Sequence, residues 1–419
     1  MSDTPTDAAI TAAWRLESTR LVAALARMTR DLDLAEDLAQ DALVAALEQW
    51  PATGVPANPA AWLMAVAKRR AVDHARHGEV VRRRSVQLGH DLEEADVPDL
   101  SDAVDHIEDD VLRLMFLTCH PVLPADGRAS LTLRLVGGLT TAEIARASFT
   151  KEATVGQRIS RAKRTLADAG VSFEVPVGAE REARLADVMN VIYLVFNEGY
   201  AATAGADWTR PELCREATRL ARMLAALVPD DPEVLGLQAL LELQSSRLPA
   251  RRDADGRPVL LEQQDRGRWD LLLVHRGLRA LERASALGKP VGTYFLQASI
   301  AACHARARDA ADTDWRQIAS WYDLLATHAP GPVVEVNRAL AHGRAFGPDG
   351  GLAILDAVPA SALGGSALPD SVRGDLLMAA GRWSEAGTAF RAAAASTPNQ
   401  GERSLLLRRA EEAASRGRP

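Results

Sequence analysis

The chain has 419 residues, of which 47% are hydrophobic and 25% are charged, and its formal net charge is −7 at pH 7. This length exceeds what one ordinary hydrophobic core organises, so we expect two or three domains. The negative total does not exclude nucleic acid as a partner, because basic and acidic residues gather in different stretches. No run approaches about 18 apolar residues and no apolar leader is visible, so we expect a cytoplasmic protein without membrane contact.

Metal and catalytic chemistry have little support in the sequence. The three cysteines, Cys119, Cys214 and Cys303, are far apart and form no CxxC pair, and no histidine pair has ligand spacing. No set of nucleophile, base and orienting group stands out either. We therefore predict no metal, no cofactor and no enzymatic activity.

Two helices are predicted between residues 14 and 50, where apolar side chains recur at helical spacing. The second helix begins after Asp33 and contains the stretch AEDLAQDAL. Its polar face carries Asp37, Gln40 and Asp41 on an otherwise Ala/Leu-rich rod. On composition alone, a solvated face is the simpler interpretation of these three residues.

A proline-rich loop and a strongly basic helix follow. Pro51, Gly54, Pro56 and Pro59 predict a stiff loop, in which Asn58 directly precedes the helix that contains Trp62. This helix and its continuation carry seven basic residues: Lys68, Arg69, Arg70, Arg76, Arg82, Arg83 and Arg84. Such a run is typical of a phosphate-binding surface, although basic helices also occur simply as solubilising features.

An acidic linker is predicted at residues 81–104. Between Asp91 and Asp110 the chain has ten acidic residues and no Lys or Arg, and with few apolar side chains this stretch cannot bury a core.

The stretch from Gly137 to Leu166 predicts two short helices joined by a tight turn. Thr140, followed three residues later by Glu143, is a capping box for the first helix, and Thr150 is the expected N-cap of the second. The second helix has an apolar face and an opposite, strongly basic face that carries Gln157, Arg158, Arg161, Lys163 and Arg164. A helix-turn-helix inserts such a helix into the major groove; the alternative is a basic, solvated face on an ordinary hairpin.

The remaining residues, from the break at Val175 to Gly178 to the end, predict an α-helical array. Gly374, Leu377, Gly381, Ala386, Phe390, Ala393 and Pro398 match the small, large and proline positions of a tetratricopeptide repeat. Two stretches escape this pattern, VIYLVFNEGYAAT near Tyr200 and the polar loop from Arg251 to Asp270. We assign no function to either.

The motifs together resemble the extracytoplasmic-function (ECF) sigma factors of the sigma-70 class, in the group with a C-terminal tetratricopeptide-like extension. AEDLAQDAL is similar to sigma region 2.2, WLMAVAKRRAVD to regions 2.3 and 2.4, and EIA, TV and RISRAKRTL to region 4. The resemblance implies an all-α fold with a region 2 bundle at residues 10–80, a region 4 helix-turn-helix at 105–170 and the extension at 175–419. It also implies core RNA polymerase and promoter DNA as partners.

Site residues follow from the resemblance, position by position. Core polymerase would dock on Asp37, Gln40 and Asp41. The −10 element would be held by Asn58, Trp62, Lys68, Arg69, Arg70 and Arg76, where Arg69 replaces an Asn that many relatives have. The −35 element would be read by Thr154, Gln157, Arg158, Arg161 and Lys163. The acidic linker would either act as a spacer or lie in the polymerase cleft as a mimic of nucleic acid.

We therefore predict a sigma factor whose C-terminal extension contacts its own sigma domains. The first rival is a polymerase-independent helix-turn-helix regulator with a helical sensor domain, which leaves the basic helix after Pro59 unexplained. The second rival is a repeat scaffold that binds only a protein partner.

Overall fold

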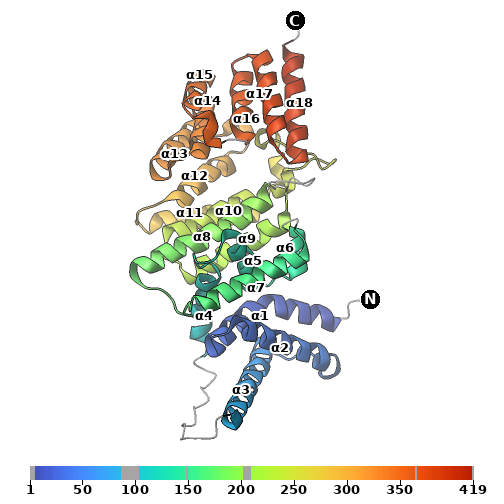
Figure 1. Cartoon of the computed structure of the whole chain (residues 1–419). Helices are drawn as coiled ribbons and strands as arrows, with labels where there is room; N and C mark the ends of the chain where they lie inside the picture. Colours follow the sequence, from blue (N-terminus) through green and yellow to red (C-terminus); the bar gives the residue numbers. More distant parts are fainter. Residues whose placement is uncertain (1–4, 86–102, 148–149, 202–208, 364–365, 418–419) are drawn as a thin grey trace. The chain divides into compact units, whose positions relative to one another are not determined.

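The structure is a computed structural model that describes residues 5–85, 103–147, 150–201, 209–363 and 366–417. Within these ranges the regular elements are helices, and the only extended pairing is an isolated bridge between Arg252 and Pro258. The predicted all-α fold is therefore confirmed (Figure 1). The chain forms two compact units, Met1–Val191 and Ile192–Pro419.

The first unit begins with three helices: α1 (Pro5–Thr29), α2 (Leu32–Thr53) and α3 (Pro59–Ser85). α1 packs against both α2 and α3, and Leu21, Trp50 and Leu63 are almost completely buried between them. Polar side chains start the helices, because Asp31 accepts from the amides of Asp33 and Leu34, and Asn58 accepts from the Ala61 amide at 3.1 Å.

The predicted loop after α2 is shorter than expected. α2 continues through Pro51 to Thr53 and ends where the Gly54 amide donates to the Trp50 carbonyl at 3.0 Å. Pro51 has no amide hydrogen, so the hydrogen bond from residue 51 to the Leu47 carbonyl is missing, and the helix ends two residues later. The connection to α3 therefore runs from Gly54 to Asn58.

The same unit continues with α4 (Ala103–Thr118), α5 (Ala125–Leu135), α6 (Thr141–Ala147) and α7 (Glu152–Asp168). The capping box is confirmed: the Thr140 amide donates to Glu143 Oε2 at 2.8 Å, and the Glu143 amide donates to Thr140 Oγ1 at 3.1 Å. The predicted N-cap at Thr150 is wrong by one residue. Lys151 holds the N-cap position of α7, and its side chain makes no capping hydrogen bond.

The acidic stretch is only partly described, since residues 86–102 lie outside the described ranges. The extent of the linker therefore stays a prediction. Asp110, at the end of the stretch, departs from the expectation of a solvated segment, because its side chain is only 1% exposed. It accepts from Arg27 Nε at 2.9 Å and from Arg113 Nη1 at 2.7 Å, which supply the charge that a buried carboxylate needs.

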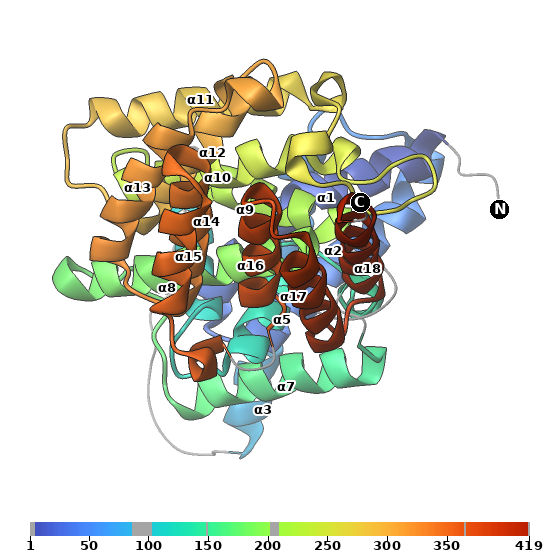
Figure 2. The ribbon, with the colours of Figure 1, turned by 90° about the horizontal axis from the view of Figure 1, so that it is seen from above.

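From residue 211 on, the second unit is a succession of helices in which each packs on its neighbours in sequence. α8 (Gly178–Tyr200) runs from the first unit into the second. The helices that follow are α9 (Pro211–Leu227), α10 (Pro232–Ser245), α11 (Leu271–Ala286), α12 (Thr293–Arg306), α13 (Trp315–His328), α14 (Pro332–Phe346), α15 (Pro348–Asp356), α16 (Leu368–Ala379), α17 (Trp383–Ser396) and α18 (Gln400–Arg416). Figure 2 shows α16, α17 and α18 side by side.

The repeat-like pattern near the C-terminus describes a real close packing of helices. A Cβ at Gly374 on α16 would lie 2.5 Å from the ring of Phe390, which is fully buried on α17. Gly381 forms the turn between these helices with φ of +73°, a conformation that glycine adopts without strain. Small residues therefore let α16 approach the Phe390 side chain, as the sequence pattern predicts.

Candidate nucleic-acid interface

Helix α7 has two sharply different faces. Val155, Ile159, Ala162 and Leu166 are buried, and the helix packs on α5 and α6. Gln157, Arg161 and Arg164 are exposed on the other side. Thr154 and Arg158 are half-buried, and they line a groove of about 160 Å³ together with Gln157, Arg161 and the start of α5. Four of the five predicted −35 residues thus lie together along one groove.

Arg158 is held by a carboxylate that the sequence did not single out. Its Nε lies 3.0 Å from Asp126 Oδ2 at the start of α5, and the two side chains are 35% and 51% exposed. An ion pair with this exposure contributes little to stability, so it can exchange for contact with another anion. Asp126 therefore orients the Arg158 side chain but leaves it able to bind another anion.

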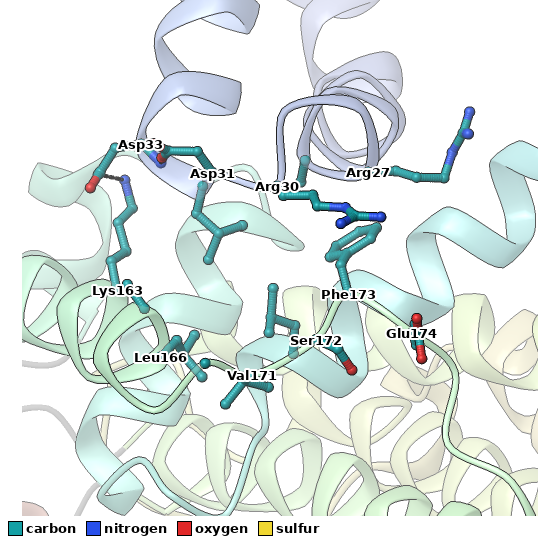
Figure 3. Close-up of a pocket in the computed structure, with 15 residues that line it drawn as sticks. Arg27, Arg30, Asp31, Asp33, Lys163, Leu166, Val171, Ser172, Phe173 and Glu174 are labelled. Carbon is teal, nitrogen blue, oxygen red and sulfur yellow. Dashed lines mark hydrogen bonds and ion pairs between the residues drawn. The ribbon is translucent and has the colours of Figure 1, made fainter.

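Lys163 does not lie with the other predicted −35 residues. Its side chain is only 10% exposed, and Nζ lies 2.6 Å from Asp33 Oδ1 on α2 (Figure 3). The same Nζ lies 2.8 Å from Glu36 Oε2, also on α2. Burial lowers the pKa of the Lys163 amine, but its hydrogen bonds to the two carboxylates outweigh that effect and raise the pKa. The amine is therefore engaged between two helices in this structure.

Glu36 is the centre of this polar cluster. It also accepts from Arg134 Nε at 2.5 Å and from Gln40 Nε2 at 3.3 Å. α2 is thereby tied to α5 and α7 through charged groups that are mostly shielded from water. Nothing in the local sequence pattern predicts these contacts, because Lys163 and Asp33 are 130 positions apart.

A cavity of about 630 Å³ adjoins the same cluster. Its lining includes Arg27 from α1, Arg30 from the turn between α1 and α2, and Asp33 from the start of α2. Lys163 and Leu166 of α7 also line it. Figure 3 shows Phe173, from the segment after α7, among these side chains. The cavity is therefore lined by both charged and apolar groups.

The predicted docking residues share one face of α2. Asp37, Gln40 and Asp41 are all exposed, while Ala35, Leu38, Ala39 and Ala42 are buried on the opposite side. Asp41 Oδ2 accepts from Arg70 Nη1 of α3 at 2.9 Å. Two residues to which the sequence assigned different roles are therefore paired with each other.

The predicted −10 residues lie along α3 and at its start. Asn58, Arg69 and Arg76 are exposed, and Lys68 and Arg70 are half-buried. Trp62 packs edge-on against the buried Trp50, with ring centroids 5.3 Å apart. The side chains of Arg82, Arg83 and Arg84 lie outside the described part of the chain.

The fold and these surfaces define an all-α DNA-binding protein with a helix-turn-helix. Residues 15–79 match the family sigma-70 region 2, and residues 113–166 match sigma-70 region 4. The chain belongs to the ECF sigma factors of the sigma-70 class and carries a C-terminal extension, in which residues 184–285 match a family of unknown function, DUF6596.

Relatives agree with this assignment. An uncharacterised protein of Rhizobium meliloti is 44% identical over 391 residues, covering 91% of this chain and 90% of the relative. The probable ECF RNA polymerase sigma factor SigI of Mycobacterium tuberculosis is 26% identical over 52% of this chain and 80% of its own length. The ECF RNA polymerase sigma factor SigK of Mycobacterium ulcerans is 30% identical over 35% of this chain and 78% of its own length. No solved structure matches the chain significantly.

Two searches of the described residues were negative. No described helix is both long and apolar enough to cross a membrane. Among the same residues, no group of three or more His, Cys, Asp or Glu side chains is arranged to hold a metal ion.

Proposed function

We propose that this sigma factor binds core RNA polymerase through α2, reads a −35 element with α7, and holds a −10 element with α3 and the segment before it. The observation that carries the proposal is the existence of three separate exposed polar faces on helices whose opposite faces are buried. Such rigid helices present side chains without a large ordering cost. No step of this function requires a catalytic residue.

Gln157 and Arg161 are the proposed base readers, because they lie four positions apart on the exposed side of α7. An amide and a guanidinium form bidentate contacts with adenine and guanine edges, whereas Arg158 and Thr154 suit the phosphate backbone. Lys163 joins the backbone contacts only if its amine leaves Asp33 and Glu36.

Polymerase docking is the proposed role of Asp37, Gln40 and Asp41. Carboxylates and an amide on one rigid face suit a partner helix that is rich in arginine. Because Asp41 pairs with Arg70, docking on α2 and contact of α3 with DNA draw on the same ion pair. Polymerase that engages Asp41 would free the Arg70 guanidinium for the nucleic acid.

Run-off transcription with core polymerase and a cognate promoter tests the proposal. A double substitution Asp37→Ala and Gln40→Ala should abolish transcription and co-purification with core polymerase, while helical circular dichroism stays unchanged. Glu48→Ala is the matched control, since Glu48 is an exposed carboxylate on the same helix, outside the proposed docking residues. Full activity of the double variant would contradict the docking role.

The rival regulator that needs no polymerase makes a different prediction. It should bind its operator tightly and specifically as the free protein in an electrophoretic shift assay. A sigma factor of the proposed kind should require core polymerase for a specific complex. Measurements at several salt concentrations separate specific binding from general attraction to phosphate, and absence of nucleic-acid binding at every salt concentration would favour the scaffold.

The proposed contact of the C-terminal extension with the sigma domains rests on the sequence alone. Hydrogen exchange of α2 and α7, compared between the full chain and residues 1–191, which are the whole of the first unit, tests it. We expect slower exchange in the full chain. Equal exchange rates would remove the idea that the extension regulates the sigma domains directly.

A further inference from the structure

The two stretches that escape the repeat pattern come together in the second unit. Tyr200 ends α8, and its backbone carbonyl accepts from Arg251 Nη2 at 3.0 Å at the start of the polar loop. The Arg251 guanidinium also lies over the Tyr200 ring, 3.8 Å from the centroid. The Phe196 ring stacks with the Tyr200 ring, and their centroids are 5.5 Å apart. The polar loop is thus built against the end of α8.

The basic residue Arg247 is also buried in this cluster. Arg247 is 9% exposed. Its Nη2 donates to the Tyr200 hydroxyl at 2.5 Å and to the Gln244 side chain. Its Nε is buried and has no hydrogen-bond acceptor among the described residues. All hydrogen-bond partners of this guanidinium within the described chain are neutral side chains. A buried cation without a counter-charge is unfavourable.

Arg266 reaches the same place from the far end of the loop. Its Nη1 donates to the carbonyls of His304 and Ala307, the latter at 2.7 Å. Its guanidinium carbon lies 4.8 Å from the centroid of the Trp269 ring, and that of Arg247 lies 6.0 Å from the same centroid. Two guanidinium groups therefore share one aromatic ring, with no carboxylate bonded to either within the described chain.

Several buried polar atoms in the polar loop also lack partners among the described residues. They are Trp269 Nε1, Gln264 Oε1 and Arg266 Nε, in addition to Arg247 Nε. Trp269 is 6% exposed, and its indole N–H is a donor that is usually satisfied when buried. Three of these four atoms are donors. Such a surplus of donors beside positive charge is the pattern of a site that awaits acceptor oxygens.

The electrostatics point in the same direction. Burial lowers the pKa of His304, and the positive charges of Arg247 and Arg266 lower it further, to about 3. The histidine is therefore neutral at pH 7 and adds no charge. Burial raises the pKa of the Tyr200 phenol, but Arg247 and Arg251 more than offset this and bring the pKa below its ordinary value. The local potential is positive enough to favour an anion.

We propose that Arg247 and Arg266, with the Trp269 indole N–H, form a binding site for a small oxyanion, a phosphate or carboxylate group of an effector. Guanidinium groups bind both kinds of oxyanion through paired N–H donors. Arg266 is only half-buried, so the site is open to solvent on that side. The site belongs to the extension alone, and its existence does not depend on how the sigma domains act.

Calorimetry and thermal unfolding of the full chain test the proposal, with inorganic phosphate and succinate as probes at constant ionic strength and chloride as the reference. Binding to the folded state alone raises the unfolding temperature with probe concentration. Phosphate and succinate distinguish the two sources of the oxyanion. We expect one of them to bind with measurable heat and raise the temperature, and no response to either would refute the site.

Variants locate the binding. Arg247→Gln and Arg266→Gln should each lower the affinity for the probe by about tenfold or more, because hydrogen bonds to charged groups are among the strongest. Arg257→Gln is the matched control, since Arg257 lies in the same loop with its side chain 59% exposed and pairs with Asp255. Equal weakening in the control would mean general attraction to a basic surface, and binding unchanged in both variants would place the probe elsewhere.

A spectroscopic readout covers the case in which a variant folds poorly. Tyrosinate absorbance near neutral-to-alkaline pH reports the Tyr200 phenol in the unaltered protein, and Tyr200→Phe identifies its contribution by difference. An oxyanion beside Arg247 offsets the positive charge that favours the phenolate. The bound probe should therefore move the Tyr200 titration to higher pH. An unmoved titration at saturating probe would contradict binding at this cluster.

Discussion

Glu36→Gln tests the charged cluster that ties α2 to α5 and α7. Glu36 is 12% exposed and accepts from Lys163, 10% exposed, and from Arg134, 22% exposed. The substitution keeps the shape of the side chain and removes its charge. Lys163 retains Asp33 at 2.6 Å, and Arg134 retains the Leu139 carbonyl at 3.2 Å.

The free-energy cost of Glu36→Gln lies between two limits. Removing one partner of a fully buried ion pair costs about 3–5 kcal/mol, and exposed pairs contribute about 0.2–1 kcal/mol. Because Lys163 and Arg134 each keep one acceptor, we expect the free energy of local opening of the first unit to fall by about 2 kcal/mol. Global unfolding of a two-unit chain is not two-state, so the local opening energy is the right quantity.

Hydrogen exchange of peptides from α7 measures this energy in the full chain. Glu48→Gln on the exposed side of α2 is the control and should change the α7 opening energy by less than about 0.5 kcal/mol. A double-mutant cycle with Lys163→Met isolates the pairwise contribution. If Glu36→Gln behaves like the control, or if the cycle gives no coupling, the cluster does not hold the helices together.

Three further predictions follow from single residues. Arg161→Ala should lower transcription from a cognate promoter and relax discrimination at one −35 position, by about 1–3 kcal/mol, in run-off assays with promoter variants; unchanged discrimination would exclude base reading. His304 has a folded pKa of about 3 against 6.5 for the free side chain, so the neutral imidazole contributes its full stability above pH 6.5. As the pH falls from 6.5 towards 3, the free energy of unfolding decreases by about 1.4 kcal/mol per pH unit. His304→Gln should make acid unfolding of the second unit less steep, and an identical pH profile would refute this. Gly374→Ala should destabilise the second unit by about 1–3 kcal/mol in thermal unfolding, because its Cβ would lie 2.5 Å from the Phe390 ring, whereas Gly350→Ala meets nothing within 4 Å and should not.

The parts of this structure that the sequence predicts are those decided by neighbours in the chain. The capping box at Thr140 and Glu143, the apolar face of α7 and the Gly374–Phe390 packing each depend on residues within one or two helices. The contacts of Lys163 escape prediction because its basic character suits both a phosphate and a carboxylate, and only the tertiary fold selects Asp33 and Glu36. Charge alone does not identify the partner.

The convergence around Tyr200 shows the same limit. The sequence marks residues 191–203 and the loop from Arg251 to Asp270 as unusual, because both mix apolar and polar groups. It cannot tell that they meet, since the pairing of Arg251 with the Tyr200 carbonyl spans 51 positions. The fold of the extension brings the two stretches together, and the cluster of donors appears only then.

In the first unit, basic side chains that already pair with carboxylates affect how strongly DNA binding depends on ionic strength. Arg70, Arg158 and Lys163 each already have a carboxylate partner in Asp41, Asp126 or Asp33. Binding of a basic residue to a phosphate normally releases condensed counterions from DNA, with about 0.9 added to the slope of log affinity against log salt for each contact. Here the incoming phosphate has to displace a protein carboxylate, which then takes up a cation of its own from solution. The uptake cancels part of the release, so promoter binding should depend less steeply on salt than the number of basic side chains on these helices implies.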